Sequence, residues 1–489
     1  MSLTSRELSE SSVEQTDSLF NIASDANKLE RGLGNRHLQM IAIGGAIGTG
    51  LFMGSGKTLS LSGPSIFFIY AIIGGFLYFL MRAMGEMLLS NLGYKSFRDI
   101  VEDMLGPWAG FFAGWTYWFC WVVIGMADLV AVTSYVTWWW PECPKFIPAV
   151  LMVLFLLGLN LVAVKLFGEI EFWFALIKIV AIVALIGTAV LMVVNGFVSP
   201  ASANYPEGAQ ASFLNILNLD GGGLFPNGIT GFLAGFQIAF YAFLGIELVG
   251  TAAAETKDPQ KTLPKAVNAI PIRVCLFYIC ALAAILCVTP WKDVDPAISP
   301  FVNMFSLTGL AIAASVINFV VLTSAASSAN SGIYSNSRML FGLAESSKAP
   351  KALGRLSASK VPANALIFSC ACVIPGIGFL YATDSIIEAF TYATTVASVL
   401  FVFVWTLIIV SYLVYRKRSP QLHERSTYKM PFGIPMSWAV IVFFAALLVI
   451  LALDEATLIA MALTPIWFVA LAIAYVVHLK RAKAHGGAI

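Results

Sequence analysis

The sequence predicts an all-α integral membrane protein with twelve transmembrane helices. Of its 489 residues, 59% are hydrophobic and only 11% are charged, whereas soluble domains carry roughly a quarter charged residues. A helix can cross the hydrocarbon where about 20 consecutive residues are predominantly apolar, and the chain holds twelve such runs. They cover residues 37–60, 64–89, 107–138, 146–164, 167–195, 228–254, 266–289, 306–340, 363–382, 385–415, 433–453 and 460–479.

The distribution of lysine and arginine predicts how these spans are oriented, because both residues accumulate in the cytoplasmic connections of membrane proteins. With both termini in the cytoplasm, the inner segments include the basic stretches 348–360 and 416–429. The outer segments then hold only Lys57, Lys145 and Lys292. We therefore expect an even number of spans. The polar start of the chain has no signal-peptide pattern and is expected to be a disordered cytoplasmic tail.

Composition also argues against an enzyme and against nucleic-acid or metal binding. The net charge is only +2, and the seven cysteines lie mostly inside spans, where we expect them to pack as apolar residues. The four histidines fall in cytoplasmic segments or at span ends, so the sequence predicts no buried histidine-based acid–base pair. Residues 54–58 resemble the end of a phosphate-binding loop, but Leu51 stands where its first glycine is required. We expect no cofactor, no obligate protein partner, and an ion gradient as the energy source.

Two spans are interrupted by small residues where a helix should continue. The first contains four glycines within residues 44–50, and the sixth carries Gly245 beside the intramembrane carboxylate of Glu247. Interrupted spans at matching places in two halves point to an inverted-repeat transporter with a site at mid-membrane. The alternative interpretation is that the glycines only allow close helix packing.

The inverted repeat predicts how the chain is divided. Five spans form each half, so the second half starts from the opposite face of the membrane, and two spans remain. The predicted parts are a cytoplasmic tail (1–35), the first repeat (36–195), an outer loop (196–227), the second repeat (228–416), the last two spans with their cytoplasmic loop (417–480) and a cytoplasmic tail (481–489).

A broken membrane helix leaves backbone groups without partners, at several kcal/mol each, and a substrate can satisfy them. In the first span, Gly48, Thr49 and Gly50 would direct N–H groups and positive helix dipole toward a carboxylate. In the sixth, the carbonyl groups around Phe243, Leu244 and Gly245 would accept from an ammonium group. Together they describe a site for the two ends of a zwitterion.

Ionisable residues in the spans are the next candidates, since each costs on the order of 3 kcal/mol or more at the bilayer centre. Lys178 lies near mid-membrane in the fifth span, where a buried lysine can gain and lose a proton. The alternative is a permanent ion pair with Glu247 or Asp128. Glu247 can bind substrate, relay a proton or lock the halves together, and we expect gating or coupling.

Polar and aromatic residues elsewhere in the spans suggest a lined cavity. Trp121 and Asp128 in the third span and Ser327 and Ser328 in the hydroxyl-rich eighth span are candidates, although the small residues of the eighth span also suit close packing. Two inner features are assigned to structure instead. Arg82 and Glu86 lie four residues apart and are expected to pair. In residues 96–105, charged and apolar residues alternate at helical spacing, which predicts a helix lying along the inner surface.

Three stretches resemble bacterial amino acid permeases of the amino acid–polyamine–organocation superfamily. They are Ile43–Phe52, Gly168-Glu169 followed by Lys178, and Gly245–Glu247 with Ala253–Pro259. The resemblance covers nearly the whole chain after the first 30 residues. It implies a leucine-transporter-like fold of five plus five spans with two extra helices. It also implies that the substrate carboxylate binds at the first break, the amino group at the sixth span, and that Lys178 replaces the cation of sodium-driven relatives.

The function implied by the resemblance is proton-coupled symport of small neutral amino acids (glycine, D-alanine and D-serine) across a bacterial inner membrane. The narrower substrate assignment rests on overall similarity to members with that range, which includes residues 53–58, 115–121 and 323–332, and no single residue indicates the chirality of the substrate. Two alternatives stay open at this point. The same machinery can carry other neutral or aromatic L-amino acids, or the chain can be a sensor that transports nothing. The partners expected are the amino acid, the proton and the lipid bilayer.

Overall fold

The computed structural model describes residue 40 and residues 44–161, 164–218, 221–251 and 258–484. The regular secondary structure in this part of the chain is helical, and the one β-type contact is an isolated bridge between Val198 and Gln210. The predicted all-α class is therefore confirmed. The α-helices are α3 (Thr49–Phe52), α4 (Gly54–Ser62), α5 (Ile66–Ser90), α6 (Phe97–Leu105), α7 (Pro107–Trp139), α8 (Phe146–Leu161), α9 (Val164–Val194), α10 (Gly228–Ala234), α11 (Phe236–Tyr241), α12 (Leu248–Thr251), α13 (Pro259–Val288), α14 (Pro300–Ser306), α15 (Ala311–Glu345), α16 (Ala363–Val373), α17 (Gly376–Ala382), α18 (Ile386–Arg418), α19 (Pro420–Arg425), α20 (Gly433–Leu451) and α21 (Glu455–Ala484). The predicted tail 1–35 lies outside the described residues.

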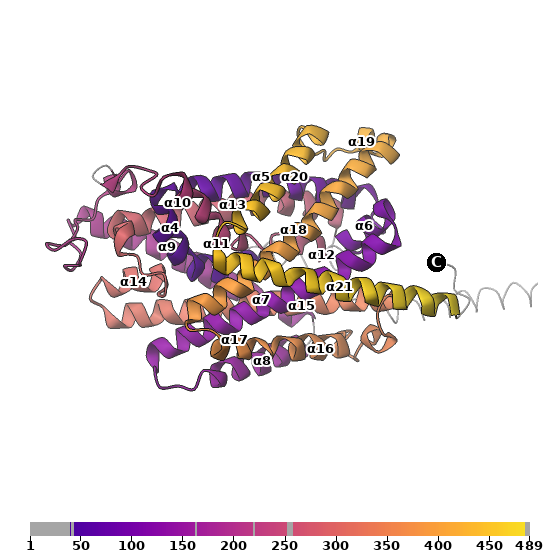
Figure 1. The fold of residues 1–489 in the computed structure, drawn as a ribbon, viewed down its shortest axis with the longest axis horizontal. Coiled ribbons are helices and arrows are strands. Elements are labelled where there is room, and N and C mark those ends of the chain that lie inside the picture. Colours follow the sequence, from indigo (N-terminus) through magenta and orange to yellow (C-terminus); the bar gives the residue numbers. More distant parts are fainter. Residues whose placement is uncertain (1–39, 41–43, 162–163, 219–220, 252–257, 485–489) are drawn as a thin grey trace, which may run out of the picture.

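Within the described residues, nine helices are long and apolar enough to cross a membrane. Two shorter apolar helices, Phe146–Leu161 and Gly228–Tyr241, stand where the fourth and sixth spans were predicted. The first predicted span corresponds to α3 and α4, and a 3₁₀ turn at Gly63–Ser65 joins α4 to α5. The helices α5, α15 and α21 run roughly along the length of the molecule, and α18 and α20 are inclined to them (Figure 1).

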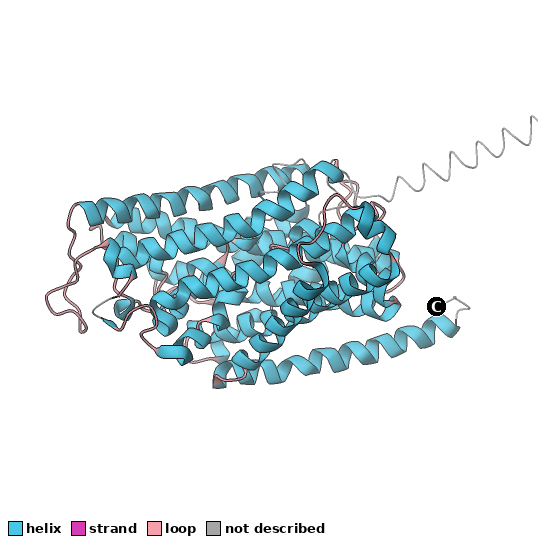
Figure 2. Ribbon diagram, turned by 90° about the horizontal axis from the view of Figure 1, so that it is seen from above, coloured by secondary structure: helices cyan, strands magenta, loops and turns pink. Residues whose placement is uncertain are grey.

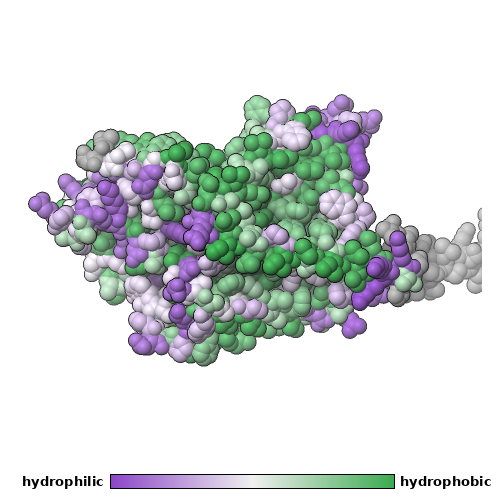
Figure 3. Space-filling view, viewed as in Figure 1, coloured by the Kyte–Doolittle hydropathy of each residue, from purple (hydrophilic) through white to green (hydrophobic). Residues whose placement is uncertain are grey.

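Burial distinguishes central helices from peripheral ones. The most apolar stretch of α7 has 78% of its residues buried inside the protein, whereas that of α21 has only 22%. Helix α21 lies along one edge of the bundle (Figure 2), while α7 packs against both α15 and α18. The exposed side chains between the two ends of the molecule are largely apolar (Figure 3), as expected for a lipid-facing surface.

Connecting segments gather at the two ends of the bundle. Helices α6 and α19 lie at the same end as the C-terminus, and α10, α14 and the loop that precedes α10 lie at the other end (Figure 1). Which end faces the cytoplasm stays a prediction.

The predicted surface helix after the second span is α6, and a capping box between Ser96 and Asp99 begins it. Its buried face carries Arg98, which donates to Glu102 on the next turn and to Ser346 just after α15. Lys348 also pairs with Glu102. Burial lowers the pKa of the Lys348 ammonium group, and the Glu102 carboxylate opposes this shift. These contacts attach α6 to the end of α15.

The predicted pair between Arg82 and Glu86 is wrong. Arg82 instead donates to Asn268 and to the backbone of Lys429. Glu86 is fully buried, and its carboxylate accepts hydrogen bonds from Tyr412 (3.0 Å) and the Met430 N–H (2.7 Å).

The Glu86 carboxylate also lies 2.5 Å from Nδ1 of His423 on α19. The sequence predicted no buried pair between a histidine and an acid. This prediction is wrong, because His423 contacts the buried Glu86 carboxylate. Sequence separation explains the error, since the two partners are 337 positions apart in the chain.

Replacing Glu86 with alanine tests this connection between α5 and the segment 419–432. The change leaves the Met430 N–H and the Tyr412 hydroxyl without an acceptor, at about 1–3 kcal/mol for each buried group. We expect a clear fall in melting temperature in detergent. Glu424→Ala is the matched control, because Glu424 is exposed on α19. Equal melting temperatures for both variants would contradict the structural role of Glu86.

Candidate functional site

The first predicted span is broken at the position that its glycines indicated. Residues 44–46 are helical, residues 47 and 48 form a bend, and α3 begins at Thr49. Gly48 has extended backbone angles, with φ −131° and ψ −151°. Since α3 begins only at Thr49, the N–H groups of Thr49 and Gly50 have no acceptor within that helix.

The sixth predicted span is broken as well. Helix α11 ends at Tyr241, residues 242–247 form turns, and α12 begins at Leu248. Gly245 adopts a φ of +104°, a conformation that residues with a Cβ rarely adopt. The predicted interruption beside Glu247 is therefore present in the backbone.

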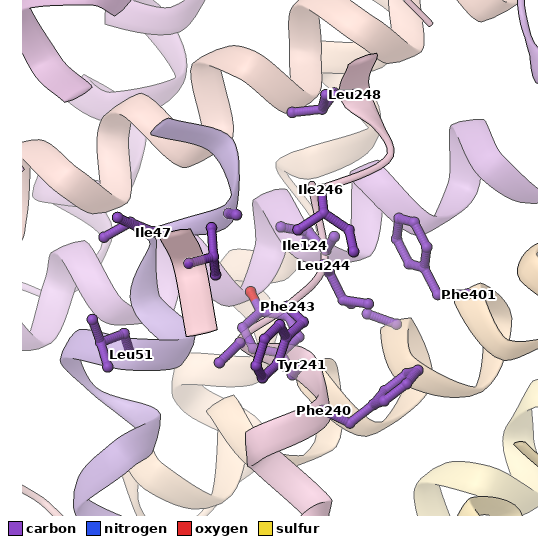
Figure 4. Packing of buried hydrophobic residues seen from close by; sticks show 14 of the residues in the cluster. Ile47, Leu51, Ile124, Phe240, Tyr241, Phe243, Leu244, Ile246, Leu248 and Phe401 are labelled. Atoms are coloured by element: carbon purple, nitrogen blue, oxygen red, sulfur yellow. The ribbon is translucent and has the colours of Figure 1, made fainter. Parts of the chain in front are cut away.

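The two breaks pack against each other without intervening side chains. A Cβ atom added to Gly50 would lie 2.5 Å from the Cα of Ala242, and one added to Gly245 would lie 2.8 Å from the carbonyl carbon of Gly45. Figure 4 shows the apolar side chains around this contact, among them Ile47 and Phe243. Glycine is required here because backbone meets backbone.

Side chains from other helices satisfy the carbonyl groups freed by the first break. Lys178 on α9 donates to the Gly44 carbonyl. The Tyr278 hydroxyl on α13 lies 2.6 Å from the Ala46 carbonyl, and Ser324 on α15 donates to the Ile47 carbonyl over 3.1 Å. Each group would otherwise be buried without a partner, at a cost of several kcal/mol.

Tyr278 also connects the two breaks, because its hydroxyl lies 2.6 Å from the Ala242 carbonyl of the sixth span. A hydroxyl has one proton, so it can donate fully to only one of the two carbonyl groups at a time. Neither Tyr278 nor Ser324 was predicted as a site residue. Ser324 lies in the hydroxyl-rich stretch of the eighth span, whereas nothing in the local sequence of Tyr278 distinguishes it from residues that pack in a helix bundle.

A small cavity lies between the breaks. Its volume is about 10 Å³, close to the least space that one water molecule needs. It is lined by Gly45, Ala46, Gly48, Thr49, Gly50, Trp121, Ile124, Tyr241, Leu244 and Ser328. Six of these residues were predicted for the site: Gly48, Thr49, Gly50, Trp121, Leu244 and Ser328. The described conformation is thus closed around the site.

The other predicted site residues lie around the cavity rather than in its wall. Phe243 packs against the rings of Tyr70 and Tyr278, with centroid distances of 5.6 and 5.3 Å. Asp128 accepts a 2.7 Å hydrogen bond from the hydroxyl of Thr49, so it is one side chain removed from the cavity. Gly245 contacts the first span, as described above.

Lys178 is 1% exposed, and it forms no direct ion pair with any residue that the structure describes. The alternative of a permanent ion pair with Glu247 or Asp128 is therefore not realised in this conformation. The charges of Glu171 and Asp128 nevertheless lie near enough to interact with the Lys178 ammonium group. The bond from Lys178 to the Gly44 carbonyl makes this side chain part of the first break.

Glu171 is a buried carboxylate that the prediction missed. It accepts from Ser327 (2.5 Å) and Asn330 (3.2 Å), both on α15. A Cβ atom on Gly44 would lie 2.8 Å from its Oε1, so the carboxylate lies against the same residue whose carbonyl accepts from Lys178. The spacing of seven residues between Glu171 and Lys178 places both on one helix face, and that spacing was the available signal. Ser327, predicted to line a cavity, binds this carboxylate instead.

Glu247 holds the second break together. Its Oε2 accepts from the Gly245 N–H (3.0 Å), and its Oε1 accepts from the Tyr117 hydroxyl (3.2 Å). Tyr117 in turn lies 3.1 Å from Ser335 on α15. Glu247 is fully buried and absent from the cavity wall. Its contacts link the unwound segment to α7 and α15.

The part of the chain that the structure describes has no cluster of three or more histidine, cysteine or acidic residues suited to a metal ion. What the site offers is backbone N–H groups at the first break, carbonyl groups at the second, and buried charges behind them. This arrangement can bind a small molecule that has one anionic and one cationic end.

Comparison with known proteins agrees with a site for such a molecule, because the chain is similar to amino acid permeases. Residues 37–486 match the model of the amino acid permease family. The chain is 60% identical over 447 residues to the D-serine/D-alanine/glycine transporter of Escherichia coli strain K12, which covers 91% of this chain and 93% of the relative. It is 50% identical to the amino-acid permease AapA of Bacillus subtilis (93% of this chain, 96% of the relative) and 42% identical to the DL-alanine permease SerP2 of Lactococcus lactis (79% and 83%).

Gly50→Ala tests the backbone contact between the breaks. The added methyl group meets the Cα of Ala242, so the segments must separate, and overpacking of this kind costs about 1–3 kcal/mol. We expect a lower melting temperature. Gly342→Ala on α15 is the control, because an added Cβ atom there meets nothing within 4 Å. A stable Gly50→Ala protein would contradict the close approach.

Proposed function

Because this chain belongs to the amino acid permease family, we propose that it is a secondary active transporter that carries small neutral amino acids, including glycine, D-alanine and D-serine, into the cell together with protons. The observation that supports this most directly is the small cavity enclosed by two adjoining helix breaks. The 60% identity to a transporter named for these three substrates supports the same range.

The proposed binding mode uses the backbone. The substrate carboxylate accepts from the N–H groups at Thr49 and Gly50, where the positive end of a helix dipole adds to the attraction. The ammonium group donates to carbonyl groups near Phe243 and Leu244, beyond the end of α11. Transport requires the cavity to open from its closed volume to admit the substrate.

The cavity walls favour a small side chain. Trp121, Ile124, Tyr241 and Leu244 occupy the space around the polar groups. All four are buried and at most 4% exposed. A substrate with a large side chain would have to displace them from a packed interior, which is costly. We therefore favour glycine, alanine and serine over aromatic amino acids.

The proposed architecture has twelve spans, of which the first ten form a leucine-transporter-like inverted repeat. Breaks in the first and sixth spans, five spans apart, support it. We place both termini in the cytoplasm of a bacterial cell and the protein in the inner membrane. The basic stretch 416–429, which includes α19 at the same end of the bundle as the C-terminus, supports this orientation.

Proton coupling is proposed from the buried charges at the first break. Lys178 donates to the Gly44 carbonyl, and the buried acids Glu171 and Asp128 act on its charge, so the protonation state of this group of charges affects the geometry of the segment that leads to Thr49. A change in protonation can bias the break between two arrangements, which is the requirement for coupling.

Uptake of labelled glycine and D-alanine into sodium-free proteoliposomes tests this function. We expect accumulation only when an inward proton gradient is imposed. Accumulation of larger amino acids instead would support the same machinery with another substrate range. Specific binding with no net flux of any amino acid would contradict transport and favour a sensor.

Lys178→Ala tests the coupling residue. The variant loses the donor to Gly44, so we expect gradient-driven accumulation to fall by roughly 10-fold or more while exchange of substrate across the membrane is partly retained. Lys265→Ala is the control, since Lys265 is exposed near the start of α13. Full proton-driven accumulation by Lys178→Ala would remove this residue from the coupling mechanism.

A further inference from the structure

The buried charges around the first break do not balance. Asp128 and Glu171 are both 0% exposed, Lys178 is 1% exposed, and the charges of both acids act on the lysine. With all three ionised, the group has two negative charges and one positive charge. An uncompensated charge within a membrane protein is costly. One additional proton makes the group neutral.

Glu171 has surroundings suited to a carboxylate that stays ionised. Its two oxygens accept from Ser327 and Asn330, respectively. The Asn330 carbonyl oxygen is itself occupied by Asn160, at 2.6 Å, which orients the Asn330 amide group toward Glu171. Hydrogen bonds to both oxygens favour the charged form of a carboxyl group.

Asp128 has surroundings that satisfy a negative charge less well. Its Oδ1 accepts from Thr49 at 2.7 Å, and its Oδ2 has no hydrogen-bond partner within the described residues although it is fully buried. The titratable groups facing it are Lys178 on α9, Tyr135 on its own helix α7 and Tyr241 on α11. On α15, the neutral Ser328 hydroxyl faces the Asp128 carboxylate and also lines the cavity. Only one of these groups, Lys178, carries a positive charge, and it is shared with Glu171.

We propose that the transported proton resides on Asp128, while Lys178 remains protonated and its charge compensates that of Glu171. The proton enters from the outer side, adds to the Asp128 carboxylate to give a neutral carboxyl group, and leaves to the inner side when that group ionises again. Lys178 keeps its bond to Gly44 throughout. This assignment rests on the proposed function and names the group that performs its proton step.

Thr49 explains how the proton and the substrate depend on each other. Its hydroxyl binds Asp128, and its backbone lies at the first break, where the substrate carboxylate is placed. Two carboxylates on either side of one threonine repel each other. Protonation of Asp128 removes that repulsion, so proton and substrate each favour binding of the other, and this dependence is reciprocal.

Lys178 is less suited to release the proton. Deprotonation would leave Glu171 and Asp128 as two buried carboxylates without a cation. It would also replace an ammonium donor at the Gly44 carbonyl with a neutral amine. Both consequences raise the free energy of the buried group.

The test compares Asp128→Asn with the wild-type protein in proteoliposomes. Three quantities are measured: glycine exchange, gradient-driven glycine accumulation, and proton influx reported by an enclosed pH-sensitive dye. We expect Asp128→Asn to keep exchange within about 3-fold of wild type and to lose accumulation and glycine-dependent proton influx by about 10-fold or more. Glu207→Gln, on the exposed outer loop, is the matched acid-to-amide control and should behave as wild type.

Two outcomes separate the hypotheses. A wild-type protein without gradient-driven accumulation contradicts the proposed function itself. A wild-type protein and an Asp128→Asn variant that both accumulate glycine with proton influx contradict only the Asp128 assignment.

Infrared difference spectra of the wild-type protein cover the case in which Asp128→Asn does not fold. Glycine binding should produce the carbonyl band of a protonated carboxyl group, and Asp128→Glu should shift that band. No such band in the wild-type protein, or a band that Asp128→Glu leaves unchanged, overturns the assignment.

Discussion

The need to satisfy backbone groups inside a membrane constrains the whole structure. Two helices are broken in the middle of the bundle, and each break frees carbonyl and N–H groups that lipid cannot bind. Lys178, Tyr278 and Ser324 bind three carbonyl groups of the first break from three different helices. Glu247 binds a backbone N–H of the second break. Thr49 and Gly50, whose N–H groups begin α3, line the cavity, and we propose that the substrate carboxylate binds there.

The same constraint connects binding to movement. Because the two breaks touch through backbone atoms at Gly50 and Gly245, neither can shift without affecting the other. Tyr278 reaches a carbonyl group of each break with one hydroxyl, so it can favour one break or the other. A substrate that supplies its own donors and acceptors changes this balance. Such competition between internal and substrate hydrogen bonds provides a physical basis for alternation between two arrangements.

The buried charges beside the first break are a second influence on its arrangement. Asp128, Glu171 and Lys178 meet around Gly44 and Thr49, and their balance depends on a single proton. Since Asp128 binds the threonine that lines the cavity, a proton and a zwitterionic substrate can act on one residue from two sides. The contact between Glu86 and His423 at the end of the bundle shows that buried carboxylates in this protein have different roles according to their partners. This one attaches a connecting segment to α5.

The sequence by itself determined the helical membrane class, the two breaks and most of the cavity wall. Apolar run length and glycine clusters are local properties, and both survive in the fold because lipid leaves few alternatives to a helix. Only the tertiary structure decided which side chains meet. The partners of Lys178, the pairing of Glu86 with His423 rather than Arg82, and the roles of Glu171 and Tyr278 depend on contacts between residues far apart in the chain. Hydropathy and helical spacing do not predict such contacts, because they describe each helix alone.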